Sequence, residues 1–283
     1  MKVIIPTYNR HETMRTPSLF PGEFVTLVVS NEDQYNLYAG TGTDLHIQIA
    51  DVTGNIAAKR QWILDNLVEE GEWIVMADDN IKGFRAIAEP WYSGPELDDT
   101  GILMEKPIEP KRVLDIILEC QAEAENRGAK FVGFRTNSNP FFGRKKWNDV
   151  SYVSTKICLI KKDSRIRFDP EFPMRDEVQF TAEHLLRNGR TLVNKYMYPV
   201  ANHYEAGGIG PLDSRLEKRR EECRKLMLRY PMLFKFKKNH KSTPPESDLQ
   251  LRIHSTKQLI EWRNKMFEDM NAHHVLPNQT SLS

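Results

Sequence analysis

Two carboxylates and an amide stand side by side where an apolar segment of the sequence ends. Residues 73–76 are apolar and prone to β-structure, which predicts a short buried strand. Asp78, Asp79 and Asn80 follow where this strand would leave its sheet. Open α/β sheets bind ligands at the carboxyl ends of their strands, and adjacent carboxylates favour a cation. Such hard oxygen ligands suit Mg²⁺ or Mn²⁺, and the alternative is an Asp–Asn turn that only ends the strand.

A second acidic pair, Asp176 and Glu177, stands at the predicted start of a helix. Val178 and Ala182 belong to the inward stripe of that helix, and Gly189 marks its end. One interpretation is simple charge complementarity at a helix N-terminus. The other is a general base that a rigid helix presents to a substrate.

Positive charge occurs where a helix alone does not favour it. Asn55 is a predicted N-cap, and Lys59 and Arg60 follow in the first turns of its helix. Two cations gain nothing from the positive end of the helix dipole, so an anionic ligand would explain them better. The alternative is a pair of solvated side chains on an exposed face.

Two loops offer further groups for a nucleotide or a metal. The predicted first strand, residues 2–6, ends at Pro6, and Thr7, Tyr8, Asn9 and Arg10 follow as a polar loop in which the Tyr8 ring could stack on a base. The alternative is a plain loop.

Late in the predicted catalytic region, His203 precedes a glycine-rich turn that contains Gly207 and Gly208. The histidine could bind a metal, and the glycines could let backbone N–H groups approach a phosphate. A lone histidine is more often structural, and such turns are common.

The order of the predicted elements indicates an α/β fold with a mostly parallel central sheet flanked by helices. Strands are predicted at residues 2–6, 24–29, 45–49, 73–76, 130–134, 153–160 and 192–197, and helices at 54–67, 111–127, 176–188, 213–230 and 255–271. We expect residues 1–211 to form the catalytic domain and residues 212–283 to form a basic helical extension. Residues 89–110 form a proline-rich acidic loop, and connections of this length are usually functional or disordered.

Two segments have the composition of a nucleic-acid contact. Residues 135–149 combine aromatic and basic groups, including Phe142, Arg144 and Trp147, although an ordinary loop anchored by one buried tryptophan would look similar. Residues 213–241 hold eleven Lys or Arg residues against four acidic residues, and Arg219, Arg220 and Lys225 are among them. That excess predicts a surface that follows phosphates, with a solvated helix face as the alternative.

The composition is that of an ordinary globular protein. The chain has 283 residues, a formal net charge of +1 and 40% hydrophobic residues. Cys120, Cys158 and Cys223 lack metal-ligand spacing and are expected to be reduced and buried. We see neither a signal peptide nor a run near the ~20 apolar residues of a membrane span, so we expect a cytoplasmic protein.

Taken together, the motifs resemble those of GT-A glycosyltransferases, in the expected order. The matching segments are residues 3–10, residues 54–64, Ala77–Asn80, Arg175–Val178 and His203. The resemblance implies a UDP-sugar donor with Mn²⁺ or Mg²⁺, a metal bound by Asp79 with Asp78, Asn80 and His203, and Asp176 as the base, with Glu177 as second choice. It also implies donor contacts from Pro6, Thr7, Tyr8, Arg10, Asn55, Lys59, Arg60, Asp78, Gly207 and Gly208.

Within that superfamily, the chain is most similar to the TET-associated glycosyltransferases of tailed phages. This resemblance implies transfer to hydroxymethylated pyrimidines in DNA, in the host cytoplasm if a phage encodes the protein. Phe142, Arg144, Trp147, Arg219, Arg220 and Lys225 would then contact the DNA acceptor. The alternatives are transfer to a glycan or a protein, a sugar nucleotidyltransferase, and a DNA-binding module without activity. The sequence does not indicate an oligomeric state.

Overall fold

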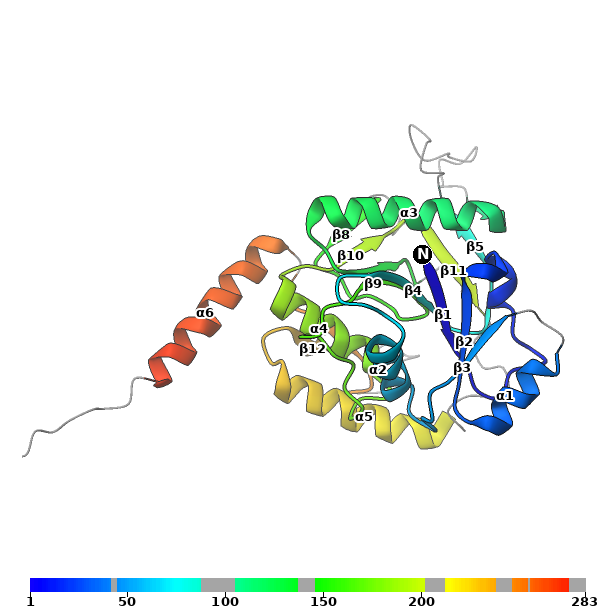
Figure 1. Cartoon of the computed structure of the whole chain (residues 1–283). Helices are drawn as coiled ribbons and strands as arrows, with labels where there is room; N and C mark the ends of the chain where they lie inside the picture. Colours follow the sequence, from blue (N-terminus) through cyan, green and yellow to red (C-terminus); the bar gives the residue numbers. More distant parts are fainter. Residues whose placement is uncertain are drawn as a thin grey trace, which may run out of the picture.

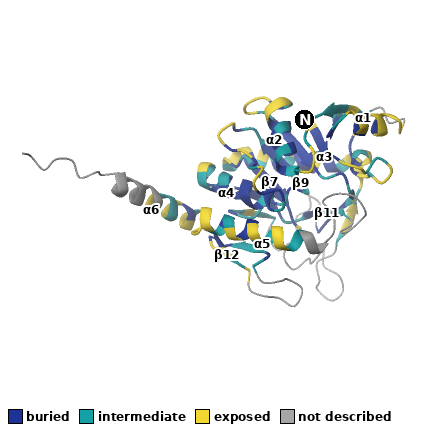
Figure 2. Cartoon of the chain, turned by 90° about the horizontal axis from the view of Figure 1, so that it is seen from below, coloured by how far each residue is buried: buried dark blue, intermediate teal, exposed yellow. Residues whose placement is uncertain are grey.

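The computed structural model describes residues 1–41, 45–87, 105–136, 146–201, 212–237, 246–253 and 255–274. A central sheet lies between two helical layers, with α3 on one face and α2 and α4 on the other (Figure 1). Figure 2 shows buried residues concentrated in the sheet and on the inner faces of these helices. The predicted fold class is confirmed: the sheet is mixed, mostly parallel and flanked by helices.

The central sheet has eight strands in the order β3-β2-β1-β4-β9-β7-β10-β8. Strands β3, β2, β1 and β4 are mutually parallel, whereas β9 runs antiparallel to both of its neighbours. Because helices cover both faces of this sheet, its inner strands have nearly continuous apolar sequences. Their bounds are β1 Lys2–Pro6, β2 Val25–Val29, β3 His46–Ile49, β4 Trp73–Ala77, β7 Phe131–Phe134, β8 Trp147–Asp149, β9 Ile157–Lys161 and β10 Leu192–Asn194.

Local signals explain where the helices begin and end. The Asn55 side chain accepts a hydrogen bond from the N–H of Ala58 at the start of α2, and Gly128 ends α3 in the left-handed conformation. At the start of α1, the Asn31 side chain likewise accepts a hydrogen bond from the N–H of Gln34. The bounds are η1 Thr16–Leu19, η2 Gly22–Phe24, α1 Glu32–Ala39, α2 Ile56–Asn66, α3 Pro110–Arg127 and α4 Asp176–Asn188.

A second, antiparallel sheet has the strand order β11-β5-β6, with β5 at Ile81–Ala86, β6 at Lys106–Ile108 and β11 at Met197–Ala201. The prediction of one strand over residues 192–197 is therefore wrong, because that segment belongs to two sheets. Asn194 accepts hydrogen bonds from the N–H groups of Tyr196 and Met197, and this turn separates β10 from β11.

The C-terminal part adds α5 (Leu212–Arg229), β12 (Phe234–Phe236), β13 (Leu249–Leu251) and α6 (Thr256–His274). The β12–β13 pair is not in the sequence prediction. Leu226 and Phe234 share an apolar cluster with Val178 and Leu185 of α4. Leu259, near the start of α6, is buried in the same cluster, and α6 then projects from the rest of the molecule (Figure 1). The division into residues 1–211 and 212–283 stays a prediction. Within the described ranges, no helix combines the length and apolarity needed to span a membrane.

Candidate active site

The Asp78–Asp79 turn lies at the carboxyl end of β4, beside the end of β1. The N–H of Asp78 donates to the carbonyl of Lys156 at 2.7 Å, and the Thr16 hydroxyl donates to the carbonyl of Asp78 at 2.5 Å. The N–H of Arg15 donates to the carbonyl of Asp79 at 3.1 Å. These hydrogen bonds tie the backbone of the turn to residues 15–16 and to Lys156.

Arg60 joins the two acidic motifs. Only 4% exposed, it donates from Nη1 to Asp176 Oδ2 and from Nη2 to Asp78 Oδ1 at 2.8 Å. Nη2 also lies 3.4 Å from the carbonyl of Thr155. A buried guanidinium requires such counter-charges because its desolvation costs several kcal/mol. The structure therefore places the motif after β4 and the motif at the start of α4 around one side chain.

Asp79 belongs to a different network. Its Oδ2 accepts from the Thr7 hydroxyl at 2.8 Å, and its Oδ1 lies 3.6 Å from Arg10 Nε. Tyr38 Oη is 2.5 Å from Thr7 Oγ1 and accepts from the N–H of Arg10 at 3.0 Å. When Asp79 is ionised it only accepts, so Thr7 uses its proton there and Tyr38 donates to Thr7.

Lys59 supports the loop after β1. Its ammonium is buried and donates to the carbonyl of Thr7 at 2.9 Å and to the Ser30 hydroxyl at 2.7 Å. Burial lowers the pKa of Lys59 to about 8, against the opposing charge of Asp79. The Lys59 Nζ atom also lies 5.9 Å from the centre of the Tyr8 ring, which is 36% exposed at the surface of this loop.

The carboxyl groups of the site are held in environments that disfavour their charge. Burial raises the pKa of Asp176 to about 8, with Arg60 opposing and Glu177 adding to the rise. Burial raises the pKa of Asp79 to about 6, with Thr7 and Arg10 opposing. Desolvation also raises the pKa of Asp78, against the pull of Arg60 and Lys156. A buried carboxyl group with a raised pKa is stabilised when it binds a proton or when a cation lies beside it.

Glu177, the neighbour of Asp176, faces other groups. Tyr152 donates from its hydroxyl to Glu177 Oε1 at 3.0 Å, and Arg175 Nη1 lies 3.5 Å from the same oxygen. Asp176 and Glu177 therefore have separate ion-pair partners, although they are adjacent in sequence.

The fit of a divalent ion rests on the donor chemistry. Asp78 and Asp79 supply hard carboxylate oxygens, and about a third of the Asp78 side chain (34%) is exposed. Within the described residues, no group of three His, Cys, Asp or Glu side chains is arranged to hold a metal. His203, the predicted further ligand, lies outside these residues, and so do Gly207, Gly208, Phe142 and Arg144. The two aspartates fit an ion, and the complete ligand set stays a prediction.

Of the remaining predicted residues, Pro6 and Asn80 directly adjoin Thr7 and Asp79 of the site, whereas Trp147 does not. Pro6 ends β1, and Asn80 lies in the turn between β4 and β5. Asn55, at the start of α2, also donates to the carbonyl of Pro170 at 2.9 Å. Trp147 is on β8, the edge of the central sheet opposite β3, where it packs against the main core.

The predicted DNA contacts on α5 form ion pairs within the chain. Arg219 lies 3.7 Å from Asp248, and Arg220 lies 3.2 Å from Glu217. Lys225 pairs with two acids, Glu171 at 3.1 Å and Glu221 at 3.2 Å.

Sequence reasoning missed three residues of the site: Tyr38, Ser30 and Lys156. Ser30 directly follows a predicted strand, and that position was the available signal. Tyr38 lies on α1, a short polar helix without a clear apolar stripe, although Asn31 offered a cap signal. Lys156 precedes β9; burial lowers its pKa, and the negative charge of Asp78 opposes that shift.

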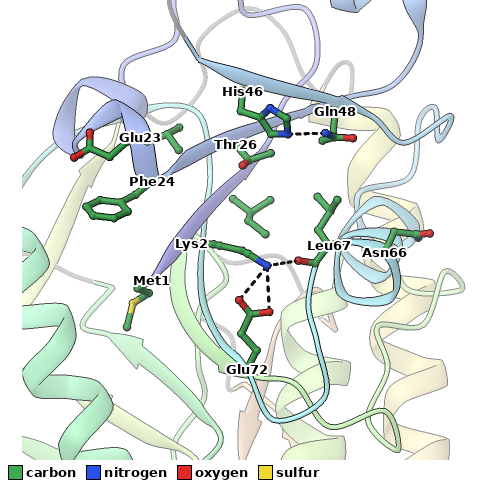
Figure 3. A pocket seen from close by; sticks show the side chains of 12 residues that line it. Met1, Lys2, Glu23, Phe24, Thr26, His46, Gln48, Asn66, Leu67 and Glu72 are labelled. Atoms are coloured by element: carbon green, nitrogen blue, oxygen red, sulfur yellow. Dashed lines mark hydrogen bonds and ion pairs between the residues drawn. The ribbon is translucent and has the colours of Figure 1, made fainter.

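A separate groove of about 650 Å³ lies at the amino ends of β1, β2 and β3, at the opposite edge from Asp78 (Figure 3). Four of its polar side chains contact one another in pairs: Lys2 lies 3.0 Å from Glu72, and Gln48 lies 2.6 Å from His46. We assign it no role.

No model of a known protein family matches the sequence, and comparison with curated proteins gave no relative. Solved structures do share the fold. A structure described as a mycobacterial protein has 9% identity and a TM-score of 0.51, over 88% of this chain and 82% of its own. Glucosyl-3-phosphoglycerate synthase from M. tuberculosis has 13% identity and a TM-score of 0.51, over 88% and 89% of the two chains. The shared architecture is the GT-A, Rossmann-like fold.

Proposed function

We propose that the protein is a metal-dependent glycosyltransferase that moves a sugar from a UDP-sugar to a hydroxyl group. The observation that carries the proposal is the contact of Arg60 with both Asp78 and Asp176. It gathers both acidic motifs in a fold shared with a glucosyl-3-phosphoglycerate synthase. Neither a strand-ending turn nor a simple helix cap requires these two carboxylates to share one buried cation.

On the donor side, Tyr8 offers an exposed ring for the base, and Lys59 holds the loop that carries it. Asp78 and Asp79 would hold a divalent ion, which supplies positive charge for the departing diphosphate. Arg60 was expected to contact that diphosphate. Because its guanidinium is held by two carboxylates, we propose instead that it orients Asp78 and Asp176.

On the acceptor side, we propose that Asp176 takes the proton of the hydroxyl as its oxygen attacks the anomeric carbon. A bond forms between the acceptor oxygen and the sugar, the bond between the sugar and the phosphate breaks, and the nucleoside diphosphate leaves. This direct displacement inverts the anomeric centre. A pKa of about 8 makes the ionised Asp176 a stronger proton acceptor than an ordinary carboxylate, and the ionised fraction grows as the pH rises towards 8. Glu177 is the second candidate for the base.

The proposal is tested by measuring UDP release from UDP-sugars by the purified protein, with Mn²⁺ or Mg²⁺ and with EDTA. We expect release only with a metal, and its loss in Asp79→Ala while the protein stays folded. Glu246→Gln, which changes an exposed carboxylate that pairs with Arg224, is the control. Full activity in EDTA or in Asp79→Ala would refute the metal site, and pyrophosphate release would indicate a nucleotidyltransferase.

We propose further that the acceptor is 5-hydroxymethylpyrimidine in DNA, acted on in the cytoplasm. Support comes from the resemblance to the TET-associated group and from the positive composition of residues 213–241. The ion pairs of Arg219, Arg220 and Lys225 within the chain reduce the charge that is available to phosphates.

The acceptor is tested by mass spectrometry of nucleosides from hydroxymethylated DNA incubated with the enzyme and UDP-sugars. We expect a hexose-sized mass gain on a pyrimidine, and none on unmodified DNA. Transfer to a protein or glycan, without any gain on DNA, would replace this acceptor.

A further inference from the structure

Arg175, which directly precedes the proposed base, is held by the C-terminal part of the chain. The residue is 6% exposed, and its Nη2 donates to the carbonyl of Ser247 and to Asp248 Oδ1, the latter at 2.9 Å. Its Nη1 lies 3.5 Å from Glu177 Oε1. The planar fork of one guanidinium therefore connects the segment before β13 with the start of α4.

A second contact fixes the residue before Arg175. Glu222 on α5 is 3% exposed, and its Oε2 accepts from the N–H of Met174 at 2.8 Å. This contact ties the backbone just before the acidic pair to α5, which comes after α4, β10 and β11 in the chain.

Apolar packing surrounds these polar contacts. Phe172 and Val178, on either side of the acidic pair, belong to the same buried cluster as Leu226, Phe234 and Leu251. The segment from Phe172 to Val178 is thus held by side chains from α5, β12 and β13, and Asp176 lies in its middle.

We propose that Glu222, Asp248 and the apolar side chains of α5, β12 and β13 that pack against α4 form a positioning element of the active site, which holds Arg175 and so fixes Asp176 and Glu177. The inference rests on the proposed function, because it gives these two carboxylates a catalytic task. Asp248 supplies a counter-charge that keeps Arg175 directed away from Asp176. Without it, the guanidinium loses one of the acceptors that hold it, and its contacts with the Ser247 carbonyl and Glu177 remain.

This role differs from that of a separable extension. A DNA-binding appendage would act through exposed cations, and its loss would leave the donor reaction intact. Here the contacts to Arg175 and Met174 are buried and reach the residues next to the proposed base. The Glu246 carboxylate, two positions before Asp248, pairs instead with the exposed Arg224 at 2.7 Å.

Asp248→Asn tests the proposal, and Glu246→Gln is its matched control, since both replace a carboxylate by its amide two positions apart. We expect kcat for UDP release to fall about 10-fold in Asp248→Asn, with the KM for UDP-sugar unchanged. Hydrogen exchange at the backbone amides of residues 174–178 should become faster in Asp248→Asn and stay at the wild-type rate in Glu246→Gln.

Arg175→Lys is the second variant, because one ammonium cannot span the same acceptors. We expect a loss of roughly 100-fold in kcat with the same exchange signature. If Asp248→Asn and Arg175→Lys keep both wild-type kcat and wild-type exchange, the positioning element is refuted. If the wild type releases no UDP, the proposed function fails, and the catalytic part of this inference fails with it. Faster exchange at 174–178 in that case still shows that Asp248 holds this segment.

Discussion

Two groups of cations were expected to bind anions, and the structure places them in opposite environments. Lys59 and Arg60 are buried beside the acidic motifs, where Arg60 contacts Asp78 and Asp176. Arg220 and Lys225 lie on the surface of α5 and pair with exposed acids. The two groups of side chains carry the same charge, but burial determines how strongly that charge interacts with its neighbours. A buried cation fixes the geometry of its partners, whereas an exposed one is screened by solvent.

The largest effect expected from this difference is on stability. At pH 9, where Asp176 is ionised, Arg60→Met leaves this carboxylate buried without its counter-charge, so the free energy of unfolding should fall by about 3–5 kcal/mol. Urea unfolding followed by circular dichroism measures the change. Lys225→Met is the control on α5, and we expect it to unfold at the wild-type urea concentration. Equal effects of the two substitutions would contradict the comparison.

The second effect is on the pH dependence of transfer. Asp176 must lose its proton to act as a base, so its pKa of about 8 predicts that kcat rises with pH and reaches half its maximum near pH 8. The negative charge of Glu177 contributes to that raised pKa. Glu177→Gln should therefore move the midpoint to lower pH while the plateau is kept. A Glu177→Gln protein without activity would assign the base to Glu177 instead.

These predictions depend on contacts that the sequence alone could not provide. The acidic motifs, the Asn55 cap and the end of α3 at Gly128 were predictable, because each depends on neighbouring residues. The position of Arg60 was not, because Asp78 is 18 residues away and Asp176 is 116 residues away. Only the packing of α2 against β4 and α4 brings these groups together.

Short elements were missed for a different reason. Strands β12 and β13 have three residues each, too few to show an alternating pattern. The division of residues 192–197 between two sheets depends on one side chain, Asn194, which satisfies two backbone N–H groups. Propensity favours a strand on both sides of that turn and does not indicate the turn itself.

The smallest effect concerns the exposed cations. If DNA is the acceptor, binding should weaken linearly when the logarithm of affinity is plotted against that of salt concentration. Replacing Arg219, Arg220 and Lys225 together by Gln should reduce the slope by fewer than about three counterions, because acids in the chain already pair with them. Fluorescence anisotropy with a labelled duplex gives the slope. A reduction of about 2.7, the full value for three charges on duplex DNA, would show that these side chains leave their acids to bind phosphate.

Asp176 has the central role in the proposed active site. Asp176→Asn keeps the size of the side chain and its place at the start of α4 but removes the proton acceptor. At saturating UDP-sugar and Mn²⁺, with hydroxymethylated DNA as acceptor, we expect the rate of UDP release to fall by about 10²–10⁴-fold. Calorimetry should show that the variant still binds UDP as the wild type does. A wild-type rate of UDP release from Asp176→Asn would contradict the assignment of the base and of the site built around it.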